Sequence, residues 1–245
     1  VYVAADNGTN ENHRMYVLQN TSANPLNDQW EFKGKLAAPS DKWAIDGNVF
    51  EYNNQLYMAW SGWEGDTNGQ QDIFIAKMSD PTSLSGKRVK ISSPTYPWER
   101  NGDLGTDGNP EQVFVNEGPQ FLEHDGKLFI VFSASGCWTD YYALGLLSLE
   151  GTDPMDASAW TKKEEPIFQQ TPENGVYAPG HNSFFKSPDG TEDWILYHAN
   201  SNPGEGCGNK RAPRMQRLYW NEDGTPFIGT PLPTTVLLPI PSEKF

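Results

Sequence analysis

Cysteine is scarce in this sequence of 245 residues, which limits the chemistry that the chain can carry. The two cysteines, Cys137 and Cys207, have no neighbour at the spacing of a zinc site, which argues against such a site. Each follows an apolar stretch and a few small residues, in what we expect to be equivalent loops of successive units. Two interpretations stay open: a disulfide between these loops, or two free thiols.

Basic residues and long apolar runs are also few. The chain has 18 lysines and arginines against 32 aspartates and glutamates, and its net charge of −14 repels nucleic-acid backbones and anionic membrane surfaces. No apolar run approaches the roughly 20 residues that a membrane span needs. We therefore expect neither a nucleic acid nor a membrane as a partner.

The sequence has no recognisable signal segment at its start, which is VYVAADNG. This stretch resembles the inside of a fold rather than a natural start. We therefore expect an N-terminal truncation, with any targeting segment upstream.

Aromatic residues, glycine and proline are abundant by contrast. Aromatic residues make up 13% of the chain, which also contains 23 glycines and 19 prolines. Many short strands joined by tight turns use residues in this way, whereas long helices do not. The composition therefore predicts an all-β protein.

An internal repeat organises these strands. Each copy begins with a polar or charged residue beside glycine or asparagine, followed by a short strand, a polar turn and an aromatic-rich second strand. The three copies are AIDGNVFEYNNQLYMAWSG (44–62), VNEGPQFLEHDGKLFIVFSASG (115–136) and PGHNSFFKSPDGTEDWILYHAN (179–200). A third strand is expected after each copy, at 71–78, 142–149 and 214–221.

Four-stranded units that recur after several tens of residues are typical of a β-propeller. A β-sandwich has similar strands but no reason to place a polar residue at one fixed position of each repeat. Residues 1–5, 14–20 and 30–36 match the second, third and fourth strands of an earlier unit. We therefore expect residues 1–245 to form a single β-propeller catalytic domain of about three and a half to four blades. It would lack the first blade and the innermost strand of the next.

The polar residues that open the repeats are Asp46, Glu117 and His181, spaced by 71 and 64 residues. Because the first strand of a blade lines the central channel, we expect these side chains to converge in one funnel. Two carboxylates that face one cavity suit glycoside hydrolysis, in which one protonates the leaving oxygen and the other activates water or attacks carbon. A nearby carboxylate also raises the pKa of the acid and keeps it protonated. The alternative is that each residue caps a turn.

The stretches WAIDG, NEGPQF and PGHNSF, in this order and spacing, resemble glycoside hydrolase family 43, the five-bladed β-propellers that act on arabinan and xylan. The tail RMQRLYWNEDGTPFIGTP is similar to the last blade of that family, so the resemblance spans nearly the whole chain. Within the family it points to the exo-acting α-L-arabinofuranosidases. It implies an inverting enzyme that removes terminal α-L-arabinofuranosyl residues from arabinan or arabinoxylan.

The resemblance also implies a role for each of the three residues. Glu117 corresponds to the general acid, and Asp46 to the aspartate that raises the pKa of the acid and orients it. His181 corresponds to the histidine at the floor of the funnel. In the family this histidine is often near a water-ligated calcium or another small ion, so His181 is a candidate metal contact through water. No cofactor is expected to be required.

The catalytic base of the family is an aspartate on the first strand of the first blade, and no aspartate here has the matching context. Asp6 and Asp72 are expected in or beside loops, and Asp41 precedes the strand of Asp46. We therefore expect the base to lie outside these residues, and this polypeptide by itself is not expected to turn over at a useful rate.

Four other residues are candidates for less central roles. Trp138 and Tyr177 are expected in loops beside the channel, either as stacking platforms for a sugar ring or as core anchors. Arg214 is expected to open a strand, where it either donates to sugar hydroxyls or is a surface or carboxylate-paired arginine. His198 is expected on a second strand, away from the channel, in a structural role.

These inferences predict an extracellular, secreted monomer whose partner is a plant cell-wall polysaccharide or oligosaccharide. Two alternatives stay open: a carbohydrate-binding propeller without catalysis, and a β-xylosidase or endo-arabinanase of the same family. A binding module has no need for paired carboxylates deep in a funnel, because a buried unpaired charge costs several kcal/mol. The sequence therefore favours the enzyme.

Overall fold

The computed structural model describes residues 1–26, 29–102 and 113–243, and the strands in these ranges form four consecutive units. The first unit contains β1 (Tyr2–Ala5), β2 (Arg14–Gln19) and β3 (Glu31–Lys35). The second contains β4 (Ala44–Tyr52), β5 (Gln55–Gly62), β6 (Gln70–Asp80) and β7 (Ser83–Ser92). The third contains β8 (Phe114–His124), β9 (Lys127–Ala134), β10 (Ala143–Leu149) and β11 (Trp160–Lys162). The fourth contains β12 (Tyr177–Lys186), β13 (Asp193–Asn200), β14 (Ala212–Trp220) and β15 (Pro226–Phe227).

Short 3₁₀ helices are the only helices in the described ranges, and they lie in the connections. They are η1 (Asn10–Asn12), η2 (Pro97–Glu99), η3 (Ala157–Ala159) and η4 (Pro172–Asn174). Within the described part of the chain, no helix has the length and apolar character needed to cross a membrane.

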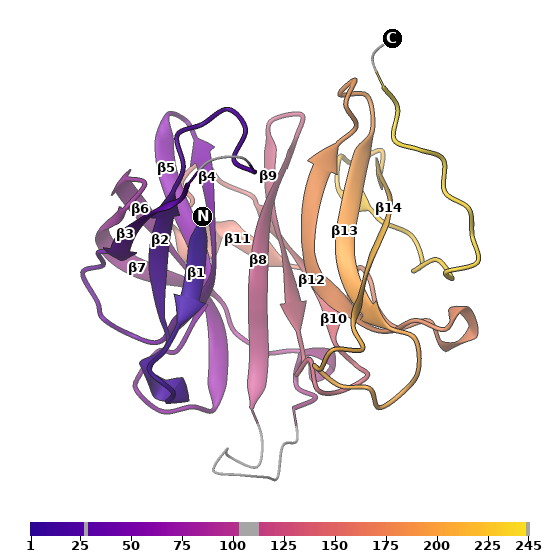
Figure 1. The fold of residues 1–245 in the computed structure, drawn as a ribbon, viewed down its shortest axis with the longest axis horizontal. Helices are drawn as coiled ribbons and strands as arrows, with labels where there is room; N and C mark the ends of the chain where they lie inside the picture. The colour runs from indigo at the N-terminus through magenta and orange to yellow at the C-terminus, as the bar shows by residue number, and fades with distance from the viewer. Residues whose placement is uncertain (27–28, 103–112, 244–245) are drawn as a thin grey trace.

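The four units stand side by side (Figure 1), with the first two at the left, the third in the centre and the fourth at the right. The first strands of the last three units adjoin, because β8 contacts both β4 and β12. A short parallel pairing of β6 with β8 joins the second and third units into one sheet. The predicted all-β architecture and its four-stranded repeat are confirmed, including the three strands expected before residue 44.

Tight turns define the hairpins of the second and third units. Asn53 and Asn54 join β4 to β5, and Asp125 and Gly126 join β8 to β9, all with positive φ. Asparagine, aspartate and glycine tolerate this backbone region, which two-residue hairpin turns require. These turns fix the register of each first strand against the second, and with it the position of the polar residues at the other end of the hairpin.

Apolar side chains fill the space between neighbouring units rather than one central core. Met15, Met58 and Phe74 belong to the cluster between the first and second units. The other two interfaces are packed in the same way, around Ile75 and Phe132 between the second and third units, and around Leu144, Ile195 and Leu218 between the third and fourth. Each interface removes apolar surface from water, at about 25 cal/mol per Å². The units therefore hold one another in place around the region where β4, β8 and β12 meet.

The two cysteines form a disulfide, so the first of the two sequence interpretations is confirmed. Cys137 follows β9, Cys207 lies between β13 and β14, and their Cα atoms are 5.3 Å apart. The bond therefore ties a loop of the third unit to a loop of the fourth.

Removal of this disulfide should lower the stability of the protein. The bond closes a loop with a sequence separation of 70 residues, and cross-links that close long loops restrict the unfolded chain, typically by about 2–4 kcal/mol. We expect the double variant Cys137→Ser/Cys207→Ser to lose that much free energy of unfolding in urea. Dithiothreitol should destabilise the wild type to the level of the variant and leave the variant unchanged. Equal stability of the variant and the oxidised wild type would contradict the expectation.

Candidate active site

A β-bulge interrupts the first strand of each of the last three units near its start. In each, two residues of the first strand lie opposite one residue of the second strand. The first residue of the bulge has a positive φ in all three strands: Asp46 (59°), Gly118 (56°) and His181 (49°). Positive φ in a residue other than glycine costs about 1–3 kcal/mol and is concentrated at functional sites. The backbone of the protein is therefore shaped at the place where the sequence predicts the site.

The bulges correct the predicted alignment of the repeat by one residue. Asp46 and His181 occupy the first position of their bulges, but the residue at that position in β8 is Gly118, not Glu117. Glu117 instead pairs with Ser133, one position before the bulge. A bulge turns successive side chains through an irregular angle, so residues one position apart can face the same space.

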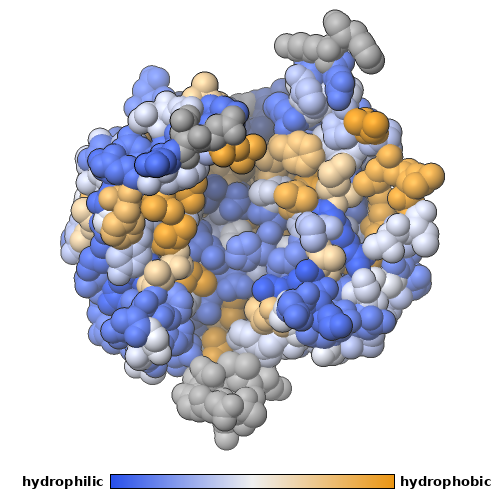
Figure 2. Space-filling view, in the orientation of Figure 1, coloured by the Kyte–Doolittle hydropathy of each residue, from blue (hydrophilic) through white to orange (hydrophobic). Residues whose placement is uncertain are grey.

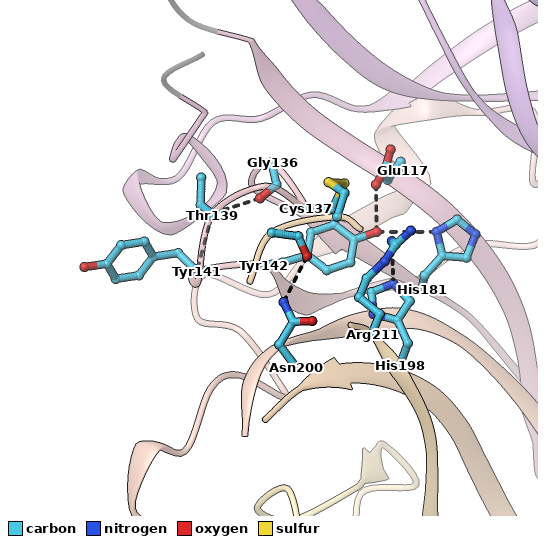
Figure 3. The surroundings of a disulfide bond; sticks show 12 residues. Glu117, Gly136, Cys137, Thr139, Tyr141, Tyr142, His181, His198, Asn200 and Arg211 are labelled. Atoms are coloured by element: carbon cyan, nitrogen blue, oxygen red, sulfur yellow. Dashed lines mark hydrogen bonds between the residues drawn. A yellow bond between two sulfur atoms is a disulfide. The ribbon is translucent and has the colours of Figure 1, made fainter. Parts of the chain in front are cut away.

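Glu117 lies at the centre of the site and is held by Tyr142 (Figure 3). The Tyr142 hydroxyl donates to Oε1 of Glu117 at 2.7 Å and lies 3.4 Å from Nδ1 of His181. Burial first and the charge of Asp46 second raise the pKa of Glu117 to about 7, against the opposing effects of His181, Tyr142 and Arg211. A carboxyl group of this kind is a proton donor near neutral pH.

Asp46 reaches the same site from β4. Its Oδ2 accepts a hydrogen bond from the backbone N–H of Gly118 at 3.1 Å, and its Oδ1 lies 3.8 Å from Nε2 of His181. Burial raises the pKa of Asp46, whereas His181 and the Gly118 N–H lower it. The structure therefore brings together the three residues that the sequence singles out, and Asp46 is bonded to the residue that follows Glu117.

Two residues that the sequence analysis did not assign to the site complete this side of it. Nε2 of His198 and Nη1 of Arg211 are 3.2 Å apart, and the His198 ring lies parallel to that of Tyr142 with centroids 5.7 Å apart. Burial, Arg211 and His181 lower the pKa of His198 to about 4, so it is neutral and accepts from the guanidinium. The prediction that His198 lies away from the channel is wrong, and Arg211 was missed.

An open hollow lies beside these residues. It is lined by His181, Ser183, Leu196, Tyr197, His198, Gly208, Arg211 and Pro213. In Figure 2 the surface is hollowed between the units at the left and the right, and hydrophilic residues occupy much of that hollow. The site can therefore admit a polar ligand from solvent, with imidazole and guanidinium groups to donate hydrogen bonds.

The two aromatic candidates lie in different segments, Trp138 in the loop after β9 and Tyr177 at the start of β12. Trp138 lies in the loop that carries Cys137, where its ring packs so closely on Gly136 that a Cβ there would come within 2.3 Å of it. Tyr177 was expected in a loop, but it is the first residue of β12 and pairs with Asn200. Both side chains are half-buried.

Arg214 is buried between the connections of the fourth unit rather than among the residues that line the hollow. Its Nη2 donates to the carbonyl oxygens of Gly175 and Asn200 and to Oγ of Ser201. Nε and Nη1 of Arg214 have no partner among the described residues. Of the alternatives for Arg214, neither a surface position nor a carboxylate partner is found, and the guanidinium that lines the hollow belongs to Arg211.

The described residues do not supply a direct set of ligands for a metal ion at His181. No group of three or more histidine, cysteine, aspartate or glutamate side chains in the described ranges is arranged to hold one. One ring nitrogen of His181 faces Tyr142 and the other faces Asp46.

Asp72 also differs from its prediction, because it lies within β6 and is 1% exposed, not in or beside a loop. It accepts from Nε2 of Gln70 at 2.7 Å and lies 3.7 Å from Nζ of Lys90. Both partners belong to the second unit, so these contacts of Asp72 support the packing of that unit.

Comparison with known proteins identifies relatives over most of the chain. An extracellular exo-α-(1→5)-L-arabinofuranosidase of Streptomyces avermitilis is 38% identical over 225 residues, 89% of this chain and 44% of the relative. An α-L-arabinofuranosidase 43 of Humicola insolens is 34% identical over 242 residues, 95% of this chain and 47% of the relative. The chain thus spans less than half the length of these curated relatives.

Solved structures share the fold. The crystal structure of an α-L-arabinofuranosidase from Lactobacillus brevis has a TM-score of 0.81 and 33% identity, covering 92% of this chain and 68% of that one. The crystal structure of a thermostable family-43 glycoside hydrolase has a TM-score of 0.78 and 25% identity, covering 98% of this chain and 73% of that one. The family model of glycosyl hydrolases family 43 matches residues 1–226. The chain therefore belongs to glycosyl hydrolases family 43, and its four units are part of that family's five-bladed β-propeller.

Proposed function

We propose that the protein is a glycoside hydrolase that releases terminal α-L-arabinofuranosyl residues from arabinan- or arabinoxylan-type plant polysaccharides, with inversion at the anomeric carbon. The observation that carries the proposal is the environment of Glu117, a half-buried side chain beside Asp46 whose pKa is raised to about 7. The relatives named as α-L-arabinofuranosidases support the choice of sugar.

In the proposed mechanism Glu117 is protonated when substrate binds and gives its proton to the glycosidic oxygen as the bond to the sugar breaks. Asp46 keeps the proton on Glu117 through its negative charge. Arg211, held by His198, and His181 line the hollow and donate to sugar hydroxyls. The carboxylate that activates the attacking water is proposed to lie outside residues 1–245.

We further propose that the protein acts outside the cell as a monomer. The name of the Streptomyces relative includes the word extracellular, and the disulfide suits an oxidising environment. Trp138 and Tyr177 are proposed as sugar-contacting aromatic residues, and Trp138 is the better placed because its loop is tied by the disulfide to the loop before Arg211.

The full gene product should hydrolyse 4-nitrophenyl α-L-arabinofuranoside and release arabinose from α-1,5-arabino-oligosaccharides. Proton NMR of the first product should show the β-anomer, because inversion converts an α-linkage into a β-product. Faster cleavage of 4-nitrophenyl β-D-xylopyranoside would favour the β-xylosidase, and binding of the oligosaccharides without any hydrolysis would favour the binding module. Either result would overturn the proposed function.

Activity should fall as the pH rises through about 7, the pKa of Glu117. The protonated carboxyl is the active form, so activity is retained below this pKa and lost above it. A profile of kcat/KM against pH reports the ionisation of the free enzyme. A profile that stays flat to about two units above that pKa would exclude Glu117 as the proton donor.

A further inference from the structure

Tyr142 is a buried tyrosine that lies directly before β10, and its ring packs against Gly180 and His198. Its side chain is completely buried. A Cβ on Gly180 would lie 2.2 Å from its Cε1, so the ring passes directly across that glycine. The ring also lies parallel to His198. The phenol therefore has little freedom to move.

The hydroxyl of Tyr142 contacts two residues of the site, Glu117 and His181. It donates its single proton to Oε1 of Glu117 at 2.7 Å, so its oxygen accepts from Nδ1–H of His181 at 3.4 Å. Burial first, and the charge of Glu117 second, raise the pKa of Tyr142 well above its ordinary value. The phenol therefore keeps its proton at the neutral pH at which Glu117 titrates.

A donor fixed on one carboxyl oxygen determines which oxygen of the acid carries the proton. Oε1 of Glu117 accepts from Tyr142, so the proton of the neutral carboxyl group resides on Oε2. In Figure 3 the other oxygen of Glu117 points away from Tyr142. The hydrogen bond also becomes stronger when Glu117 is ionised, because hydrogen bonds to charged acceptors are roughly twice as strong as neutral ones.

We propose, on the basis of the proposed function above, that Tyr142 is a positioning residue that fixes Oε1 of Glu117, directs the transferable proton on Oε2 to the leaving group, and stabilises the carboxylate that remains. The O–H bond of Glu117 breaks, its electron pair stays on the carboxylate, and the proton moves to the glycosidic oxygen. The bond between the anomeric carbon and the glycosidic oxygen breaks with its electron pair staying on that oxygen, water forms the new bond to the carbon, and the proton of the water goes to the base proposed outside residues 1–245. The contribution is to the transition state, because the hydrogen bond strengthens as the proton leaves.

The other groups around Glu117 include some that raise its pKa and some that lower it. Asp46 on β4 raises its pKa, whereas His181 on β12 and Arg211 before β14 lower it, as does Tyr142 itself. His198 on β13 is neutral over the relevant range. Removal of the Tyr142 hydroxyl leaves all of these in place, so the ionised form of Glu117 loses one stabilising contact and its pKa rises.

The test is Tyr142→Phe in the full gene product, with Tyr141→Phe as the matched control, because the neighbouring side chain of Tyr141 is 57% exposed. The ionisation of Glu117 is followed by the ¹³C shift of its carboxyl carbon in protein labelled at glutamate. We expect its midpoint to rise by about one pH unit in Tyr142→Phe and to stay unchanged in Tyr141→Phe. On an arabino-oligosaccharide, kcat should fall about ten-fold or more with little change in KM.

Incorporation of 3-fluorotyrosine at position 142 keeps the ring and makes the phenol a stronger donor, so the midpoint of Glu117 should move down instead of up. A midpoint that is the same in wild type, Tyr142→Phe and the fluorinated protein would overturn the proposal, as would a loss of kcat with an unchanged pH profile. These outcomes differ from failure of the proposed function, in which the wild type itself leaves arabinofuranosides intact.

Discussion

Substitution of Glu117 by glutamine should reduce the hydrolysis of natural arabino-oligosaccharides by about 10²–10⁴-fold, the usual contribution of a general acid. The amide keeps the shape of the side chain and can still accept from Tyr142, but it has no proton to give. The leaving alcohol then departs as an alkoxide, which is the costly step. Steady-state kinetics of the full gene product on α-1,5-arabinobiose measure the effect.

The leaving group decides whether this loss is due to missing proton transfer. A 2,4-dinitrophenyl arabinofuranoside needs little protonation, so Glu117→Gln should lose much less activity on it than on arabinobiose. Glu123→Gln is the matched control, because this glutamate lies on the same strand, β8, with its side chain exposed. Equal losses on the two substrates would mean that Glu117 positions the sugar or supports the fold.

The strands and their grouping could be predicted because they depend on local patterns that the sequence displays directly. The alternation of apolar residues identifies each strand, and Asn53–Asn54 and Asp125–Gly126 identify the two-residue turns between them. The repeat then places the starts of β4, β8 and β12 together without any knowledge of long-range contacts. Its prediction that Asp46, Glu117 and His181 converge follows from this grouping alone.

The relative alignment of these three residues could not be predicted, because it depends on the bulges. A bulge inserts one residue into a strand and leaves no reliable mark in the sequence. Asp-Gly, Glu-Gly and His-Asn look equivalent in the repeat, yet the first residue of the bulge is Asp46, Gly118 and His181. In β8 the glycine at 118, whose N–H donates to Asp46, takes the positive φ that the polar residue takes in the other two strands.

Tyr142 and Arg211 could not be found from the repeat, because the fixed polar position of the repeat marks only the residues that open first strands. In an antiparallel unit the third strand begins at the same end as the first, so the residues before β10 and β14 also lie beside the funnel. Ala143, which follows Tyr142, pairs with Ala134, and so does Asn116 at the start of β8. The rule needs the observed starts of β10 and β14 at Ala143 and Ala212, because the sequence places these strands at 142–149 and 214–221.

The second large effect is expected on stability, at a buried ion pair behind Glu117. The side chain of Glu99 is 0% exposed and that of Lys162 12%, and Nζ of Lys162 lies 2.8 and 2.9 Å from the two oxygens of Glu99. Oε1 of Glu99 also accepts from Nδ2 of Asn116, the residue before Glu117. The pair therefore anchors the start of β8, which carries the proposed acid.

The backbone of the segment before η2 depends on the same carboxylate. Oε2 of Glu99 accepts from the N–H groups of Thr95 and Tyr96, both at 2.8 Å. Burial lowers the pKa of Lys162, although Glu99 opposes the shift. The ammonium group is thus costly to bury and is tolerated because the carboxylate is beside it.

Lys162→Met should lower the free energy of unfolding by about 3–5 kcal/mol, because it leaves the carboxylate of Glu99 buried without its cation. The neighbouring Lys163 has an exposed side chain, so Lys163→Met should change stability by no more than about 0.5 kcal/mol. The double variant Lys162→Met/Glu99→Gln should recover part of the loss, because a neutral amide still accepts from Thr95 and Tyr96 but has no charge to bury. Urea unfolding of the wild type, Lys162→Met, Lys163→Met, Glu99→Gln and the double variant measures these differences. Two results would contradict the expectation: a Lys162→Met variant as stable as Lys163→Met, or a double variant that loses more free energy of unfolding than the sum of its single changes. In either case the carboxylate of Glu99 does not need Lys162, and the start of β8 is held by its hydrogen bonds alone.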